Sequence, residues 1–140
     1  MIVAIDGPAA TGKSTSAKKV SQELGFTHLD TGAMYRCVTL SVLRNQITLG
    51  NENALSQLLN ELDIRLEKLD DELVVYLNGE DVSDEIRKAE VTSYVSTVSA
   101  LSQVRNALVR IQRNIAKNQD CVVEGRDIGT IVFPDAEFKF

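Results

Sequence analysis

The sequence contains no tryptophan, and among its 140 residues there are only three tyrosines and four phenylalanines. Aromatic platforms on which single-stranded nucleic acid could stack are therefore scarce. The two cysteines, Cys37 and Cys121, lie far apart and outside any C-x-x-C spacing, which predicts neither a disulfide scaffold nor a zinc site. This use of cysteine fits a reducing compartment, and we expect a cytoplasmic protein.

Long apolar runs and an excess of basic residues are also missing. No stretch approaches the roughly 20 apolar residues that a transmembrane helix needs, and residues 1–6 carry neither the basic region nor the cleavage site of a secretory signal. Twenty acidic residues outnumber 15 basic ones, which gives a net charge of −5 and disfavours a general nucleic-acid binder. We therefore expect neither a membrane nor a nucleic-acid partner. We also expect a monomer.

The residues that are present indicate one globular domain of the α/β class. Apolar residues make up 44% of the chain and charged residues 25%, which is the average for a globular protein. Short β-branched runs alternate with segments of helical periodicity, and this alternation predicts a parallel sheet flanked by helices. The predicted strands are 2–6, 26–30, 121–123 and one that begins at 138, and the predicted helices are 13–24, 34–44, 53–62, 89–99 and 101–117.

Residues 63–83 differ in character from the strands and helices around them. Apolar and charged residues alternate over 64–67, and 73–77 is rich in residues that favour strands. Asn78-Gly79 is the strongest short signal for a β-hairpin, and Asp70-Asp71 supplies an earlier turn. The segment is therefore predicted to form a small antiparallel sheet of two or three strands, inserted among helices.

Residues 7–14 match the phosphate-loop pattern G-x-x-x-x-G-K-[ST] without a mismatch. In this pattern the glycines let backbone N–H groups point at phosphate oxygens, and the following helix directs its positive end at the same anion. The lysine places a charge on the β- and γ-phosphates, and the serine offers its hydroxyl to Mg²⁺. The predicted nucleoside-triphosphate-binding residues are Gly7, Pro8, Ala9, Ala10, Thr11, Gly12, Lys13, Ser14 and Thr15, with Lys13 as a catalytic residue and Ser14 as a metal ligand.

The loop alone does not distinguish kinases from GTPases and ATPases. The sequence has no N-K-x-D motif for reading guanine, and its length leaves little room for a motor ATPase. Two patches follow predicted strands, where α/β sheets bind ligands: L-D-T-G-A-M-Y-R at 29–36 and E-G-R-D-I-G-T at 124–130. Taken alone, the first could be an ordinary capped helix and the second a turn with a local Arg–Asp pair.

Together with the loop, these patches resemble the cytidylate kinase family of bacterial nucleoside monophosphate kinases. The resemblance covers essentially the whole chain, including G-E-D-V-S-D-E-I-R at 79–87 and V-R-N-A-L-V-R-I-Q-R at 104–113. It implies a fold of the P-loop NTPase type and transfer of a phosphoryl group from ATP, with Mg²⁺, to CMP or dCMP. It also implies that Arg36 and Arg126 are catalytic residues that clamp the acceptor phosphate. The implied CMP-binding residues are Thr31, Tyr35, Arg36, Ser96, Arg105, Arg126 and Asp127.

Within this resemblance, Arg105 and Asp127 supply a donor and an acceptor that select cytosine over uracil. Thr31 stands where some family members have serine, and Glu124 stands where others have aspartate. The implied division of the chain is a P-loop core of residues 1–35 and 115–140 and an acceptor-binding region of residues 36–114, which contains the insert at about 63–83.

The resemblance further implies residues that this sequence does not contain. The sequence ends within an apparent strand, whereas family members continue with a mobile lid, further arginines and a fifth strand. We therefore expect the 140-residue chain by itself to be weakly active or inactive. Two alternatives stay open: a nucleotide-binding fragment without turnover, and a P-loop kinase for another small acceptor such as thymidylate, adenylate or shikimate.

Other chemically capable residues have structural interpretations. His28 lies on a short strand with no acidic partner evident, which favours a structural role. Cys37 and Cys121 are predicted to be small buried residues. The residues predicted to form a solvated helix face are Arg110, Arg113 and Lys117, and the acidic stretch 67–72 is predicted to be exposed in the same way.

Overall fold

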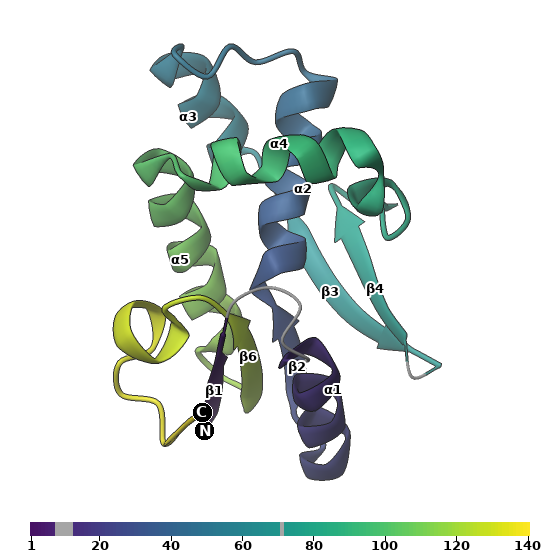
Figure 1. Ribbon diagram of the computed structural model, residues 1–140, viewed down its shortest axis with the longest axis vertical. Helices are drawn as coiled ribbons and strands as arrows, with labels where there is room; N and C mark the ends of the chain where they lie inside the picture. Colours follow the sequence, from purple (N-terminus) through teal and green to yellow (C-terminus); the bar gives the residue numbers. More distant parts are fainter. Residues whose placement is uncertain (8–12, 71) are drawn as a thin grey trace. The chain divides into compact units, whose positions relative to one another are not determined.

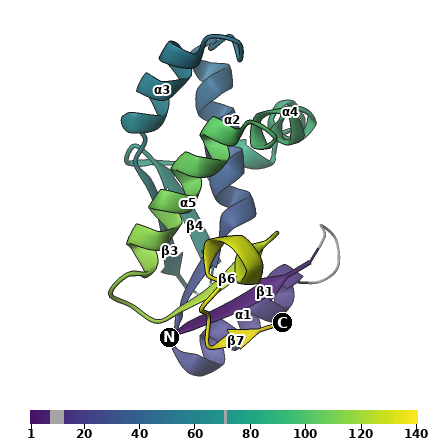
Figure 2. The same ribbon diagram turned by 90° about the vertical axis from the view of Figure 1, so that its left-hand side faces the viewer.

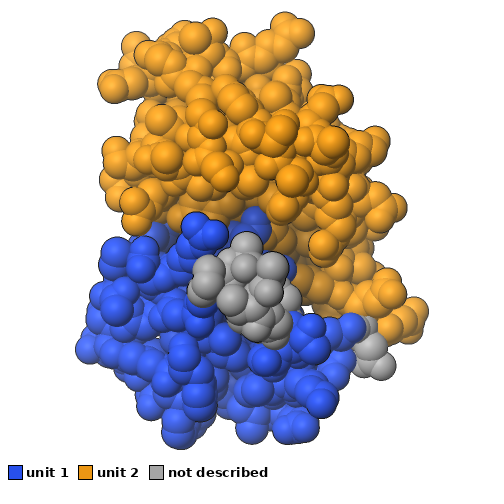
Figure 3. All heavy atoms as spheres, in the orientation of Figure 1, with its two compact units in different colours: residues 1–32, 109–140 blue, residues 33–108 orange. Residues whose placement is uncertain are grey.

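The computed structural model describes residues 1–7, 13–70 and 72–140, without the side chains of Lys13 and Ser14. Outside the described residues lie Asp71 of the predicted turn and five residues of the predicted phosphate loop: Pro8, Ala9, Ala10, Thr11 and Gly12. The chain divides into two compact units, unit 1 with residues 1–32 and 109–140, and unit 2 with residues 33–108 (Figure 3). Helices α2 (Thr31–Arg44) and α5 (Ser102–Ala116) each have residues in both units.

Unit 1 is built on a four-stranded parallel sheet with the strand order β2-β6-β1-β7. Strand β7 pairs with β1 at the edge of this sheet (Figure 2). The parallel α/β sheet predicted from the alternation of strands and helices is therefore confirmed. The strands are β1 (Ile2–Asp6), β2 (Thr27–Asp30), β6 (Cys121–Gly125) and β7 (Phe138–Lys139).

The two central strands of unit 1 are apolar because both of their faces are covered. All five residues of β6 and the middle three of β1 are buried, as expected for strands inside a parallel sheet. Helix α1 (Lys13–Leu24) packs against both strands. Its Ala17 has no exposed area and lies in one cluster with Val3, Ile5 and Val122.

The parallel arrangement brings three segments to one edge of the sheet. In the strand register, Asp6 lies opposite Gly125, and Asp30 lies opposite Glu124. The carboxyl ends of the strands are where open α/β sheets bind ligands. The segments that follow these ends are the phosphate loop, the start of α2, and the turn after β6.

Strand β6 is longer than the sequence predicts. The prediction ends the strand at residue 123, because Glu124 and Gly125 interrupt an apolar run. In the structure Glu124 pairs with Ile5 and is only 1% exposed. The carboxylate is accommodated there because Nε2 of His28 lies 2.7 Å from its Oε1, within hydrogen-bond distance.

Unit 2 combines helices with a three-stranded antiparallel sheet, in the order β3-β4-β5. Strands β3 and β4 of this sheet lie side by side (Figure 1). The antiparallel insert predicted from the sequence is confirmed. Asn78 and Gly79 join β4 to β5 with φ angles of +51° and +85°, the left-handed conformations that a type I′ hairpin turn needs. The elements are α3 (Glu52–Asn60), β3 (Ile64–Leu69), β4 (Glu72–Leu77), β5 (Glu80–Asp81), the 3₁₀ turn η1 (Glu85–Arg87) and α4 (Ala89–Ser99).

The core of unit 2 gathers apolar side chains from most of its elements. Helix α5 buries Val104, Ala107 and Leu108, which are three and four residues apart and so share one face of the helix. Helix α2 begins at Thr31, three residues before the predicted start, and its buried face includes Met34. The other large contributors are Cys37, Val38, Val42, Leu55, Leu59, Ile64, Val75, Leu77, Val82, Ile86, Val91 and Val98.

Candidate functional site

The phosphate loop begins at the end of β1, beside the end of β6. The amide of Gly7 donates a hydrogen bond to the carbonyl of Gly125 over 3.3 Å. Helix α1 begins at Lys13, and Thr15 is exposed in its first turn. A strand and a helix thus flank the loop, which is the context that the phosphate-loop pattern requires. The binding roles of its residues stay predictions.

Thr31, the first residue of α2, is 3% exposed and has its hydroxyl proton engaged. Its Oγ1 donates a hydrogen bond to the carbonyl of Glu124 over 2.7 Å. A hydroxyl has one proton and two lone pairs, so a further partner of Thr31 must be a donor. The neighbouring Gly125 makes this contact possible, because a Cβ at that position would lie 2.0 Å from Oγ1.

The buried carboxylate of Glu124 is paired with His28 on the neighbouring strand. The sequence-based interpretation that His28 has no acidic partner is wrong. In the register of the parallel strands, His28 lies opposite Val122 and Asp30 lies opposite Glu124. His28 and Glu124 are therefore diagonal neighbours on one face of the sheet. The imidazole and the carboxylate approach to 2.7 Å, which anchors the end of β6 just before Arg126.

Arg126 and Asp127 lie between β6 and a short helical turn, η2 (Ile128–Val132). Asp127 adopts a left-handed conformation, with φ +57°, which aspartate tolerates better than most residues. The carboxylate of Asp6 accepts hydrogen bonds from the amides of Ile128, over 2.6 Å, and Gly129, over 3.0 Å. The last residue of β1 therefore holds the turn that follows Asp127.

The carboxyl end of the same turn is held by Arg113 of α5. Its Nε donates to the carbonyl of Val132 and its Nη2 to the carbonyl of Ile131, each over 3.0 Å. Arg113 is exposed, as predicted, but its guanidinium is not simply solvated. A carboxylate at the amino end and a guanidinium at the carboxyl end both suit the polarity of a helical turn.

Arg36, on the second turn of α2, is held by the segment around η1. Its Nη1 donates hydrogen bonds to the carbonyl of Ile86, over 3.0 Å, and to Oγ1 of Thr92, over 2.9 Å. Ile86 is 1% exposed, so this carbonyl belongs to a well-packed part of unit 2. A guanidinium with a fixed orientation is suited to binding a phosphate through two parallel hydrogen bonds.

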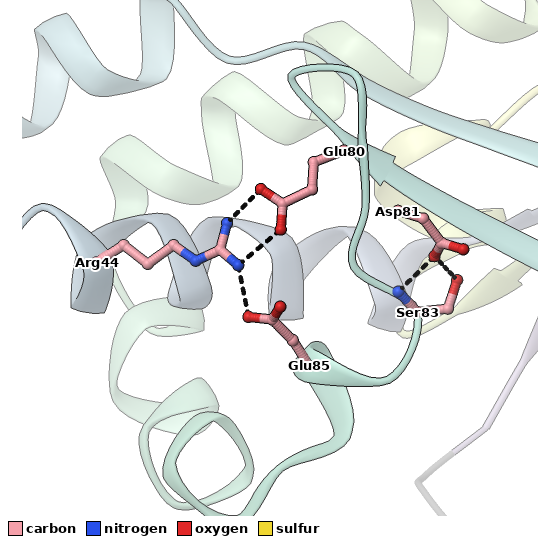
Figure 4. A network of polar contacts seen from close by, with 5 residues as sticks. All are labelled: Arg44, Glu80, Asp81, Ser83 and Glu85. Carbon is pink, nitrogen blue, oxygen red and sulfur yellow. Dashed lines mark hydrogen bonds and ion pairs between the residues drawn. The ribbon is translucent and has the colours of Figure 1, made fainter.

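A second arginine of α2, Arg44, contacts Glu85, the first residue of η1, and Glu80 of β5 (Figure 4). Arg44 donates to both carboxylate oxygens of Glu80, over 3.1 and 3.0 Å, and to Glu85 over 2.5 Å. These bonds raise the pKa of the Arg44 guanidinium above its usual value. Because the groups are exposed, each pair adds little stability. The network instead fixes where η1 lies along α2.

The remaining predicted acceptor residues are on helices of unit 2. Ser96 and Arg105 are exposed on α4 and α5, and Tyr35 is partly buried on α2. The seven predicted acceptor residues are thus divided between the units. Unit 1 contains Thr31, Arg126 and Asp127, and unit 2 contains Tyr35, Arg36, Ser96 and Arg105.

A sequence model of the cytidylate kinase family matches residues 3–140. The chain belongs to the cytidylate kinase family. The match includes the start of the phosphate loop, the antiparallel insert and the segment with Arg126 and Asp127. Membership of this family supports the P-loop type of fold that the sequence predicts.

Several cytidylate kinases are similar to almost all of the chain. The protein of Caldanaerobacter subterraneus subsp. tengcongensis is 54% identical over 138 residues, which cover 99% of this chain and 60% of that protein. The protein of Chloroherpeton thalassium is 53% identical over 144 residues, which cover 99% and 59%. That of Caldicellulosiruptor bescii is 47% identical over 137 residues, which cover 98% and 61%. The chain spans about 60% of the length of these curated relatives.

Both cysteines of this cytidylate kinase family member are buried, as predicted. Burial raises the pKa of the Cys37 thiol to about 12 and that of Cys121 to about 11. Such thiols stay protonated near neutral pH and are not nucleophiles. Among the described residues no group of three His, Cys, Asp or Glu side chains could hold a metal ion. No described helix is both long enough and apolar enough to cross a bilayer.

Four residues that hold the candidate site of this family member are not predicted as such from the sequence. They are Asp6, His28, Thr92 and Arg113. For Asp6 the sequence offers a signal, because an acidic residue stands between an apolar strand and a phosphate loop. The other three contact residues that are distant in sequence, and no local pattern marks them.

Proposed function

We propose that this chain takes part in transfer of the γ-phosphoryl group of ATP to CMP, or dCMP, giving ADP and CDP, or dCDP. The observation that carries the proposal is the match to the cytidylate kinase family over residues 3–140. The matched residues include the phosphate-loop pattern, which we propose binds a nucleoside triphosphate, and the residues that we propose bind a monophosphate acceptor. In this proposal the protein is a cytoplasmic monomer that binds neither nucleic acid nor membrane.

The phosphate loop and α1 are the proposed ATP site. Backbone N–H groups from Gly7 to Thr15 would surround the phosphates, and Lys13 would neutralise the β- and γ-phosphates. The hydroxyl of Ser14 would hold Mg²⁺, which takes most of its other ligands from phosphate oxygens and water and supplies positive charge against the developing negative charge. The proposed P-loop core is residues 1–35 and 115–140.

The proposed acceptor region, residues 36–114, works together with Thr31, Arg126 and Asp127 of the core. The hydroxyl of Thr31 donates to Glu124, so toward a base it can only accept, and the exocyclic amino group of cytosine is a donor. Asp127 would accept from the same edge and Arg105 would donate to it. Uracil presents a carbonyl in place of the amino group and would leave these acceptors unpaired, which is how a site of this kind discriminates.

The proposed catalytic contribution is positioning and neutralisation of charge. Arg36 and Arg126 would neutralise the charge of the acceptor phosphate and help to align one of its oxygens with the γ-phosphorus. The acceptor phosphate is already an anionic nucleophile, so no general base and no covalent intermediate are required. Tyr35 would pack beside the acceptor nucleotide, and Ser96 would belong to the cytosine-reading group with Thr31, Arg105 and Asp127.

Product analysis tests the proposal. The chain is incubated with ATP, Mg²⁺ and each of CMP, UMP, AMP and dTMP, and the diphosphates are separated by chromatography. Formation of CDP in preference to the other diphosphates supports the proposal. Preferential formation of another diphosphate would mean that the acceptor is wrong. Binding of ATP and CMP without any CDP would favour a nucleotide-binding fragment.

A further inference from the structure

Helix α4 presents two hydroxyl side chains on one exposed side. Thr92 and Ser96 are four residues apart and therefore lie one turn apart on the same face of the helix. Both are exposed. Oγ1 of Thr92 accepts the 2.9 Å hydrogen bond from Nη1 of Arg36, a residue 56 positions earlier in the chain. An exposed hydroxyl with a defined long-range partner is a feature that the family resemblance and the proposed function leave unassigned.

The guanidinium of Arg36 is held along one side only. Nη1 carries two hydrogens, and both are used, one on Thr92 and one on the carbonyl of Ile86. Within residues 1–7, 13–70 and 72–140, its Nε and Nη2 donate to no partner. These two nitrogens form one of the edges through which arginine binds two oxygens of a phosphate. The two bonds to Nη1 therefore fix the direction of the guanidinium, and the edge formed by Nε and Nη2 is left to bind a phosphate.

The two acceptors that hold Nη1 are themselves fixed by their surroundings. Ile86 is 1% exposed and its amide donates to the carbonyl of Val82 over 3.0 Å. The amide of Thr92 donates to the carbonyl of Lys88 over 3.0 Å at the start of α4, next to the buried Val91. A long arginine side chain loses rotamer freedom when it binds a ligand, and prior fixation removes part of that cost.

We propose that Thr92 is a positioning residue for the acceptor phosphate. It orients the guanidinium of Arg36 so that the edge formed by Nε and Nη2 faces the phosphate of the incoming monophosphate. The proposal rests on the proposed function, because that function gives Arg36 a phosphate to bind. Thr92 acts through Arg36 and does not itself need to touch the nucleotide.

The test compares the binding of CMP and of cytidine, which lacks the phosphate, by titration calorimetry. Thr92→Val keeps the shape of the side chain but removes the acceptor for Arg36. We expect it to weaken CMP binding about tenfold, and to leave cytidine binding and the thermal unfolding midpoint unchanged. Thr92→Ser restores the acceptor and should restore CMP affinity. Thr97→Val is the matched control, because Thr97 is exposed on the same helix and has no hydrogen bond to Arg36.

A double-mutant cycle separates positioning from direct contact. In an Arg36→Met background, Thr92→Val should have no further effect on CMP affinity, because the residue through which it acts is gone. An unchanged tenfold loss in that background would show that Thr92 contacts the nucleotide, which overturns the positioning role. Equal CMP affinity of Thr92→Val and the parent chain also overturns it, and leaves the proposed function intact. Failure of the parent chain to bind CMP would overturn the proposed function itself, and this inference with it.

Discussion

The hydroxyl of Thr31 reaches the carbonyl of Glu124 past Gly125, where an added Cβ would clash with the threonine oxygen. The hydrogen bond is 2.7 Å long, and a Cβ on Gly125 would lie 2.0 Å from the threonine oxygen. Two segments that are distant in the sequence, the start of α2 and the end of β6, are thus fixed to each other near Gly7, the first residue of the phosphate-loop pattern. This contact uses the only proton of the Thr31 hydroxyl, so in the proposed function Thr31 can only accept a hydrogen bond from the base.

Gly125→Ala is therefore expected to destabilise the protein. The added methyl group must displace Thr31 or the backbone, and overpacking of this kind typically costs about 1–3 kcal/mol. Urea unfolding measures the change. Gly50→Ala is the control, because a Cβ there meets nothing within 4 Å. Combining Gly125→Ala with Thr31→Ala should recover part of the loss; full additivity of the two effects would contradict the predicted clash.

Asp6→Asn is expected to loosen the turn after Asp127. The amide keeps the size of the side chain, but its NH₂ group cannot accept from the backbone, so one of the bonds to Ile128 and Gly129 is lost. Hydrogen bonds to a charged group contribute about 1.5–3 kcal/mol. Hydrogen exchange of those two amides should become markedly faster. The exposed Asp135→Asn is the control, and unchanged protection in Asp6→Asn would rule out this anchoring role.

Stability is expected to fall as the pH rises above about 9. Burial raises the pKa of the Cys37 thiol from 9.0 to about 12, so between these values the unfolded chain has lost a proton that the folded chain still binds. The free energy of unfolding then decreases with pH, by about 1.4 kcal/mol per unit for such a thiol, and the contribution levels off above the folded pKa. Urea unfolding from pH 8 to 11 should show a shallower decline for Cys37→Ala than for the parent. Parallel curves would refute the assignment.

Gln112 offers a substitution that should stabilise the fold. It is 1% exposed, and neither atom of its side-chain amide has a hydrogen-bond partner among the residues described. Leaving such a group unpaired costs about 1–3 kcal/mol. Gln112→Met, of similar volume, should therefore raise the free energy of unfolding by about 1–2 kcal/mol. Gln103→Met serves as the comparison, because Nε2 of Gln103 donates to the carbonyl of Glu52 over 3.1 Å. A loss of stability in Gln112→Met would contradict the prediction.

The sequence predicts best where the signal is local. The β-branched run 2–6 before a glycine-rich loop gives β1 and α1, and Asn78-Gly79 gives the hairpin, because each pattern determines its own backbone conformation. The predicted end of β6, at residue 123, is wrong because a carboxylate such as that of Glu124 after an apolar run usually marks the end of a strand. Its partner His28 is 96 residues away and meets it only through the register of parallel strands.

The same limit applies to the candidate site. The family resemblance identifies Arg36 and Asp127, but the residues that hold them come from other elements. Thr92 is 56 positions from Arg36, and Asp6 is 122 positions from Ile128. The sequence around Thr92 and Asp6 does not indicate which residue each of them contacts. The binding roles of the site residues themselves stay predictions until nucleotides are bound.

Selection of cytosine by this chain is tested by a calorimetric comparison of CMP and UMP binding, with Arg105→Met measured alongside. We predict that CMP binds more tightly than UMP and that the difference is largely lost in Arg105→Met, because the base-reading donor is gone. Equal affinity for CMP and UMP in the parent chain, or a preference that Arg105→Met leaves intact, would contradict the assignment of the cytosine site.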